Sequence, residues 1–565
     1  MEYTEIWQKY EAGKDHHQRH GMYQSVKKCH RFYEGDQWHG MKAGGESLPT
    51  LNFIKPIARY QINMVAMNDM AMIFTSMVAD PEVQALCEDL THFAAAQAEK
   101  CKLDQKKWEI VKNACITGDH YLYVFDARQP SESVVQELSP QLVMRLVDKD
   151  DLYLANEEEP DFARQDWIII AERLPVEEVK RRARAAKIPE DQIELIGPDE
   201  QTDAGDEPYK EMHSGEDKCT SLLHMRRTEN GCAFCRSVKT VVYEPERTVK
   251  GLKTYPVCGM RWEAKHGSAR GLGVVERLIP NQIEVNKTLA RRSLIVKRYG
   301  YPTAIVDAKK VLNPEALATV GAIVKVDNLG ANPVNSMVQY LQPAGPGGDA
   351  AALEAELLTQ SRELEGAGEA ATGQVDPTQA SGEAIKAARD QSALNLNEQT
   401  ANFKQFIEDL AQIWYQLWVA YATNGLLIRY TTEDDKQIEE TIDQEQLQAA
   451  DINIRIDVSP VDPYSVMSRE MALENALAAK HITFEEYVKA LDANSGVPKE
   501  KFQAIINARQ QSAAVKTAQT TQNQAALPME VPPVMDQTSG GQLSTDMLTA
   551  LVSGGGGDVN ALPVV

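Results

Sequence analysis

This sequence lacks the marks of three classes of protein: membrane or secreted proteins, nucleotide-driven motors and small disulfide-rich domains. No stretch approaches the roughly twenty apolar residues that cross a bilayer, and Met1–Lys14 is too polar for a signal peptide. No GxxxxGK[ST] loop is present, so the chain carries no evident nucleotide-driven motor. Eight cysteines in 565 residues do not form the dense framework of a small secreted domain. We therefore expect folding in a cytoplasm, reduced and buried thiols, and no cofactor.

Positive charge is also scarce. The chain has 82 acidic against 59 basic residues, a net charge of −23, while 43% of its residues are hydrophobic. Broad binding to a phosphate backbone needs clustered Lys and Arg. The acidity therefore argues against such binding, and it fits a protein that is simply kept soluble. Length and hydrophobic content together predict two to four structural units.

Two helical patterns surround a compact insert. Apolar residues from Leu278 to Arg298 recur at helical spacing and end in basic residues, and Ala350–Glu365 is rich in good helix formers. Between them, the short runs Thr303–Val306 and Ala322–Val326 favour strands of a small α/β unit that closes near Pro343–Gly348. The order predicts a helix, an insert and a second helix.

A glycine-rich bend and a very long helix follow. Gly366–Gly382 cannot propagate a helix, whereas Glu383–Thr423 has neither Gly nor Pro and carries one strongly apolar face. If unbroken, that helix spans about 60 Å, too long for the core of one domain. Its apolar face then needs cover from a neighbouring chain, which predicts an oligomer. Further on, the alternating residues of Leu426–Val458 favour strands, and Ser465–Arg509 favours helices.

The first part of the chain combines helices with a mixed α/β region. Leu51–Met70 and Val83–Ile116 have helical patterns, and Tyr121–Phe125 has the pattern of a strand. With the helices downstream, these elements indicate an α+β protein that is mainly helical.

One group of cysteines has the spacing of a zinc knuckle. Cys232 and Cys235 are separated by two residues, and Cys258 and His266 would supply the remaining ligands. A zinc ribbon usually has a second pair of closely spaced cysteines, which this sequence lacks. A redox function would require the two cysteines of the CxxC motif to lie at a helix N-terminus. The pair instead follows a hairpin-turn signal and precedes the strand-like run Val238–Tyr243. Ordinary strand cysteines are the favoured interpretation.

Two further groups have metal-binding residue types. His16 and His20 would share a helix face, but no further ligand is clearly placed, so a solvated face is favoured. Seven acidic residues would in principle serve a two-metal nuclease, although acidic loops are more often solvated surface: Asp148, Asp150, Asp151, Glu157, Glu158, Glu159 and Asp161. Neither group establishes an enzyme.

Several segments, taken in order, resemble the phage portal protein family of tailed double-stranded DNA viruses. Within that family they resemble the podovirus-like portals. They are RFYEGDQW at 31–38, LPTLNFIKPIARYQIN at 48–63, ITGDHYLYVFD at 116–126, VDKDDLYLANEEEPDFARQDWIII at 147–170 and GLGVVERLIPNQIEVNKTLARRSLIVKRYGYP at 271–302. The resemblance covers roughly residues 1–510 and rests on the order of these segments.

The resemblance implies a subunit with wing, stem, clip and helical crown that assembles into a ring. Its parts would be a wing of helices and mixed α/β structure at 1–270, a first stem helix at 271–300, a clip at 301–349, a second stem helix at 350–365, a tunnel loop at 366–382, a long helix and return to the wing at 383–464, crown helices at 465–510 and a low-complexity tail at 511–565.

The resemblance also implies a function. A ring, commonly of twelve subunits, would be assembled in the bacterial host cytoplasm and stand at one capsid vertex of the virion, as the conduit for packaging and ejecting double-stranded DNA. Its implied partners are the terminase large subunit, the major capsid protein and scaffold, and head–tail adaptor or tail proteins, with no membrane. The alternatives are another ring-forming virion connector and, less favoured, a metal-dependent nucleic-acid enzyme.

Within such a ring, DNA would be met through its phosphates only, because sequence reading would obstruct passage. The candidates are four basic residues of the first stem helix and three polar residues of the tunnel loop: Arg291, Arg292, Lys297, Arg298, Gln374, Asp376 and Thr378. The alternatives are salt bridges between the basic residues and neighbouring subunits, and a loop that merely joins two helices.

Overall fold

The computed structural model describes residues 2–488 outside a set of intervals. These are 42–47, 77–80, 128–140, 200–216, 301–302, 320, 328–336, 342–347, 369–393, 422–424, 432–436, 444–445, 448–451, 461–472, 474–475, 479 and 485–486. The chain forms two compact units, Met1–Asp462 and Pro463–Val565. In the second unit the described residues include a small apolar cluster around Tyr487 and Val488. Most of the predicted crown helices and the whole tail lie outside the described residues.

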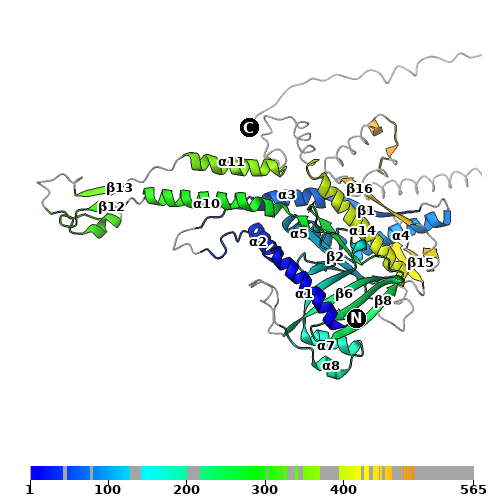
Figure 1. The fold of residues 1–565 in the computed structure, drawn as a ribbon. Coiled ribbons are helices and arrows are strands. Elements are labelled where there is room, and N and C mark those ends of the chain that lie inside the picture. The colour runs from blue at the N-terminus through cyan, green and yellow to red at the C-terminus, as the bar shows by residue number, and fades with distance from the viewer. Residues whose placement is uncertain are drawn as a thin grey trace, which may run out of the picture. The chain divides into compact units, whose positions relative to one another are not determined.

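Three helices open the first unit: α1 (Tyr3–Arg19), α2 (Met22–Glu34) and α3 (Ile54–Ala66) (Figure 1). Gly21, with a φ of 64°, makes the turn between α1 and α2, a backbone conformation that glycine adopts at little cost. Because α3 ends at Ala66, the prediction of a helix over Leu51–Met70 was too long at both ends.

The residues after α3 form a strand that the helical pattern concealed. β1 (Asn68–Ser76) pairs antiparallel with β16 (Ile452–Pro460), so that Met72 lies opposite Ile456. The alternating isoleucines of β16 correctly predicted a strand. At Asn68–Met70, the three residues of β1 that the predicted helix included, pairing with a strand far along the chain decided the structure over the local helical pattern.

A turn divides the next predicted helix in two. α4 (Pro81–Lys100) and α5 (Leu103–Thr117) replace the single helix predicted over Val83–Ile116. Lys102 between them has a φ of 53°, which is uncommon outside glycine and cannot continue a right-handed helix. α5 then leads through Gly118 into β2 (Asp119–Asp126), which confirms the strand predicted at Tyr121–Phe125.

Two antiparallel sheets follow. The larger has the order β4-β5-β6-β7-β8, formed by Leu152–Leu154, Trp167–Pro175, Lys218–Thr228, Gly231–Ser237 and Val242–Lys250. The smaller has the order β3-β2-β9, in which β3 is Leu142–Val147 and β9 is Val257–Arg261. The predicted hairpin turn before Cys232 is confirmed, because β6 and β7 meet there. The run Val238–Tyr243 is not one strand, since Val238 and Val241 close a turn before β8.

Short elements connect these sheets to the rest of the unit. α7 (Val176–Ala185) and α8 (Glu190–Glu194) pack on the larger sheet in a separate apolar cluster that includes Tyr243. The 3-10 helix η1 (Phe162–Arg164) precedes β5, and the two-residue strands β10 (Glu263–Ala264) and β11 (Gly271–Leu272) pair with each other.

The two helices predicted around the insert are confirmed. α10 (Val274–Gly300) and α11 (Gly348–Leu364) lie side by side (Figure 1). The insert between them contains η2 (Pro314–Ala318) and the antiparallel pair β12 (Thr303–Val306) and β13 (Val338–Leu341). The strand predicted at Ala322–Val326 was wrong, because Val326 alone of these residues makes a bridge, to Val311. The partner of β12 is β13 instead.

The long helix predicted over Glu383–Thr423 is not continuous. Residues 395 and 396 lie in a turn, α14 runs over Asn397–Tyr421, and residues 383–393 lie outside the described part. α14 is followed by the paired strands β14 (Leu426–Thr431) and β15 (Gln437–Ile442). The turn places the buried Leu396 in the main core instead of extending the helix.

The apolar face of α14 is covered within its own chain. Trp414 and Trp418 are fully buried, and the ring of Trp418 lies 5.0 Å from that of Phe93 on α4. The prediction that this apolar face needs cover from a neighbouring chain was therefore wrong, and the length of α14 gives no evidence for an oligomer. Among the described helices, none has both the length and the apolar character needed to cross a membrane. The fold is mixed α+β.

Candidate DNA-channel residues and a buried ionic cluster

The basic candidates lie on the second half of α10. Arg292 forms an ion pair with Glu354 of α11, and Asn281 donates to Ser361 at 3.0 Å, so polar contacts join the two helices at both places. Arg291 and Lys297 are exposed. The side chain of Arg298 lies outside the described part, and within that part Arg291 makes no ion pair. Arg292 is therefore used inside its own chain, whereas Arg291 is available to another molecule.

The loop candidates follow α11. They fall in residues 369–393, outside the described part of the chain: Gln374, Asp376 and Thr378. The residues just before this interval are firmly held. Gln61 Nε2 of α3 donates to the backbone oxygen of Glu365 at 2.7 Å, and Arg277 of α10 pairs with the Glu365 carboxylate at 3.1 Å.

Four charged side chains meet just before α10 begins, and we call them the Arg270 cluster: Asp119, Lys149 and Arg270 are buried, and Glu157 is 13% exposed. Lys149 Nζ lies 2.6 Å from Oδ1 of Asp119, and Arg270 Nε lies 2.7 Å from Oε2 of Glu157. Arg270 is also 3.7 Å from Asp119. The two cations and two anions balance, which buried charges require because an unpaired one is costly.

The Arg270 cluster also fixes the backbone around it. Arg270 donates to the oxygens of Lys149 and Leu152 at 3.1 and 2.7 Å, and Lys149 donates to those of Thr117 and Gly271 at 3.0 and 3.1 Å. These bonds join the end of α5, the turn before β4 and the strand β11. They set the position from which α10 starts, two residues after β11.

The ionised forms of both acids are favoured in this cluster. Burial by itself raises the pKa of Asp119, but Lys149 and then Arg270 outweigh it, so the pKa lies below its ordinary value. Burial likewise opposes ionisation of Glu157, and Arg270 outweighs it and holds the pKa well below the ordinary range. Both carboxylates are charged at neutral pH.

His17 of α1 joins the cluster. Its Nε2 lies 3.1 Å from Oε1 of Glu157 and 3.2 Å from a guanidinium nitrogen of Arg270, and the side chain is fully buried. Burial lowers the pKa of His17, so the ring is neutral at pH 7 and does not disturb the charge balance.

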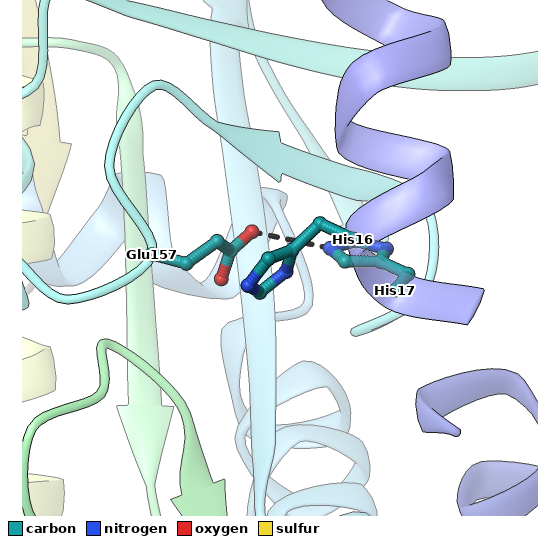
Figure 2. A group of neighbouring side chains, drawn as sticks. All are labelled: His16, His17 and Glu157. Carbon is teal, nitrogen blue, oxygen red and sulfur yellow. Dashed lines mark hydrogen bonds and ion pairs between the residues drawn. The ribbon is translucent and has the colours of Figure 1, made fainter. Parts of the chain in front are cut away.

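The side chains of His16, His17 and Glu157 offer three potential metal ligands within 4.8 Å of one another (Figure 2). Arg270, however, donates to both oxygens of Glu157 and also contacts His17. A metal ion here would face the fixed positive charge of that guanidinium. His20 is not part of the group, and its ring lies 4.3 Å from that of His16. The residues fit an ionic cluster better than the metal site considered for His16 and His20.

The seven acidic residues considered as nuclease ligands do not form one site. Glu157 belongs to the Arg270 cluster, Glu159 lies 3.7 Å from Arg164, and Asp161 caps η1. Among described residues, Asp148, Asp150 and Asp151 form the remaining acidic group, which is partly exposed. One carboxylate oxygen from each of the three lies within 4.8 Å of the others, and of the three side chains that of Asp148 is exposed.

The zinc site considered for Cys232, Cys235, Cys258 and His266 is not formed. Cys232 packs in the main core, whereas Cys235 packs in a separate cluster on the other face of the sheet. Cys258 is on β9 of the smaller sheet, and His266 lies in an exposed turn. Residues three apart on a strand point to opposite faces, so this spacing cannot present one metal with two sulfurs here. The eight cysteines are free thiols.

The Arg270 cluster is not recognisable as a unit in the amino-acid sequence. Its members come from four separate segments, and each stands in an ordinary local context. The sequence features that point to the cluster are weak. Asp119 follows the turn at Gly118, and Lys149 is a lone positively charged residue among aspartates. Burial of the four side chains together is a tertiary property.

Comparison with known proteins gives the family. A family model described as "Phage P22-like portal protein" matches residues 123–539, which is more than half of the chain. A search of curated proteins gave no match. The matched range contains the larger sheet, the smaller sheet from the second half of β2 onward, α10, the insert, α11 and α14. The chain therefore belongs to the phage P22-like portal protein family and is a virion protein that forms the DNA-translocating connector between head and tail.

Proposed function

We propose that twelve copies form a closed ring at one capsid vertex and that DNA passes through its centre during packaging and ejection. Family membership supports a ring-forming connector. The structural observation that carries the finer proposal is the pairing of α10 with α11, which together lead into and out of the β12–β13 insert (Figure 1). Two packed helices that carry a small β unit fit a stem and a clip.

The remaining parts follow from this assignment. We assign a wing to 1–270, a first stem helix to 271–300, a clip to 301–349, a second stem helix to 350–365, a tunnel loop to 366–382, the return to the wing to 383–464 and crown helices to 465–510. The Arg270 cluster supports the boundary near 271, because it joins the preceding sheets to the start of α10.

The insert has a surface suited to contacts with other chains. Several of its large apolar side chains are exposed, with Ile323 at 81%: Ile305, Leu312, Ile323, Tyr340 and Leu341. Exposed apolar residues gathered on a small unit mark an interaction surface. We assign this surface to neighbouring copies and to the terminase large subunit. The major capsid protein, scaffold and head–tail adaptor or tail proteins are the other proposed partners.

Within the ring, Arg291 and Lys297 would contact DNA phosphates, together with Arg298 and the loop residues Gln374, Asp376 and Thr378. The exposure of Arg291 and Lys297 supports this role, whereas Arg292 serves the contact with α11. Phosphate contacts carry no sequence information, which a conduit requires. A metal-dependent enzyme is the less favoured alternative, because only Asp148, Asp150 and Asp151 of the seven acidic candidates lie together among the described residues, on a partly exposed turn.

Ring formation and packaging test the proposal separately. Native mass spectrometry and negative-stain images of the purified chain should show a closed twelve-subunit ring with a hole that admits a duplex. In a packaging assay, rings with Arg291→Glu should package less DNA than rings with Lys239→Glu, which makes the same charge change on an exposed turn outside α10. Persistent monomers would contradict the ring. Rings whose Arg291→Glu form packages normally would contradict the channel assignment and favour another kind of virion connector.

A further inference from the structure

A cavity of about 510 Å³ lies between α2 and α10. Its lining includes Lys27, Lys28 and Arg31 of α2 and Lys287 of α10, together with the aromatic rings of Phe32 and Trp38. We call it the cationic groove. Figure 1 shows that α2 approaches the first half of α10, where this groove lies.

Buried amides hold the two walls of the cationic groove together. Asn286 of α10 donates to Oε1 of Gln37 at 2.5 Å, and Gln37 donates to the backbone oxygen of Phe32 at 3.0 Å. Gln282 in turn donates to Asn286 at 3.0 Å. Gln37 and Asn286 are 8% and 2% exposed, so these bonds are shielded from water. The groove is therefore a built feature of the fold.

The positive charges of α2 are not neutralised. Lys27, Lys28 and Arg31 make no ion pair with any described residue, although Lys28 lies over the ring of Phe32 at 5.9 Å. Lys287 pairs with Glu284, and the one acid in the lining, Asp36, pairs with His39. A surplus of positive charge on a chain with net charge −23 is a local exception that attracts ligands of opposite sign.

We propose that the cationic groove binds the phosphate backbone of duplex DNA. This inference rests on the proposed function, since it needs DNA at the protein. Lys27 and Arg31 are one helical turn apart and Arg291 lies one turn beyond Lys287, so the charges continue from α2 along α10. A row of flexible, positively charged side chains suits the repeating phosphates of a DNA backbone. Aromatic side chains between them add contact area without reading the DNA sequence.

The test compares DNA binding of full-length wild type and Lys27→Glu/Arg31→Glu, by fluorescence anisotropy with a labelled duplex over a range of NaCl concentrations. The variant should bind at least about tenfold more weakly, and its plot of log affinity against log salt should be shallower by about two for each groove that engages DNA. The matched control is Lys239→Glu/Lys265→Glu, which reverses two exposed lysines outside the groove. The control should keep the wild-type affinity and slope.

Three further measurements make each result decisive. Lys27→Arg/Arg31→Lys should retain DNA binding, because phosphate contact needs charge more than side-chain shape. Lys27→Gln/Arg31→Gln replaces the reversal variant if circular dichroism shows that the latter does not fold, and it should lose affinity in the same direction. Native mass spectrometry reports the ring for every variant.

The outcomes separate this inference from the proposed function. Normal rings that bind DNA equally well with and without the groove charges would overturn the inference and leave the ring proposal standing. An equal loss of DNA affinity in the groove and control variants would also overturn the inference, because the net charge of the protein would then explain binding. Loss of the ring in the groove variants alone would identify a contact with acidic side chains of a neighbouring copy instead. A wild type that forms no ring contradicts the proposed function, while the groove comparison still decides on DNA binding.

Discussion

Arg270 donates to both carboxylate oxygens of Glu157, from Nε to Oε2 at 2.7 Å and from a terminal nitrogen to Oε1 at 2.8 Å. The side chains are 5% and 13% exposed. Glu157→Gln leaves the guanidinium with one buried anion fewer, so the free energy of unfolding should fall by about 3 kcal/mol. The urea midpoint, measured at fixed protein concentration, reports the change.

The control for this pair is Arg164→Gln. Arg164 lies 3.7 Å from Glu159 and its side chain is 73% exposed, so its loss should change stability by less than about 1 kcal/mol. A similar fall in the free energy of unfolding for both variants would show that the buried Arg270–Glu157 pair matters no more to stability than an exposed pair.

His224 should make stability depend on pH. It is 1% exposed on β6, and burial, followed by the nearby charge of Lys9, lowers its pKa to about 4. The unfolded chain binds this proton near its ordinary pKa of about 6.5, so stability is lost as pH falls below that value. At pH 5 the loss from His224 should reach about 2 kcal/mol. His224→Phe removes the titration and keeps an aromatic ring beside Trp167.

The measurement is the difference in urea midpoint between wild type and His224→Phe at pH 7.5 and at pH 5. The difference should shift in favour of the variant at the lower pH. His39→Phe makes the same substitution at an exposed histidine and is the comparison. An unchanged difference for His224→Phe would show that the buried histidine is protonated equally in both states.

Gly271 should not accept a side chain. A Cβ there would lie 2.2 Å from the backbone oxygen of Gly118, in the segment where the Arg270 cluster meets α10. Backbone atoms cannot yield as a flexible side chain does, so Gly271→Ala should cost at least about 2 kcal/mol. Gly197→Ala meets nothing within 4 Å and should be nearly neutral. Thermal unfolding of both variants tests this, and equal melting temperatures would contradict the close approach.

The thiols of β7 should be unreactive in the folded protein. Burial raises the pKa of Cys232 to about 12 and that of Cys235 to about 11. The thiolate is the reactive form, so at pH 8 iodoacetamide should modify both slowly in buffer and rapidly in urea. Peptide mass spectrometry gives the rates. A chelator should leave the unfolding midpoint unchanged, whereas a fall would restore the zinc interpretation.

Local sequence was sufficient where each segment's own pattern decided its structure. Apolar spacing and helix-forming residues predicted the pair α10 and α11, and alternation predicted β16. The pattern failed where distant contacts intervened. The helical pattern before β1 extends into its first residues, which form a strand because they pair with β16. The turn before α14 places Leu396 in the core, although no Gly or Pro interrupts the segment.

The candidate sites divide in the same way. The sequence alone determined that the chain is acidic, that basic residues gather on α10, and that the order of segments is that of a portal protein. Only the tertiary structure decided that Arg292 pairs with Glu354, that Cys232 and Cys235 face apart, and that Arg270 is buried among Asp119, Lys149 and Glu157. Periodicity places a side chain on a face of its own element, but the partner on that face comes from packing between segments distant in the chain.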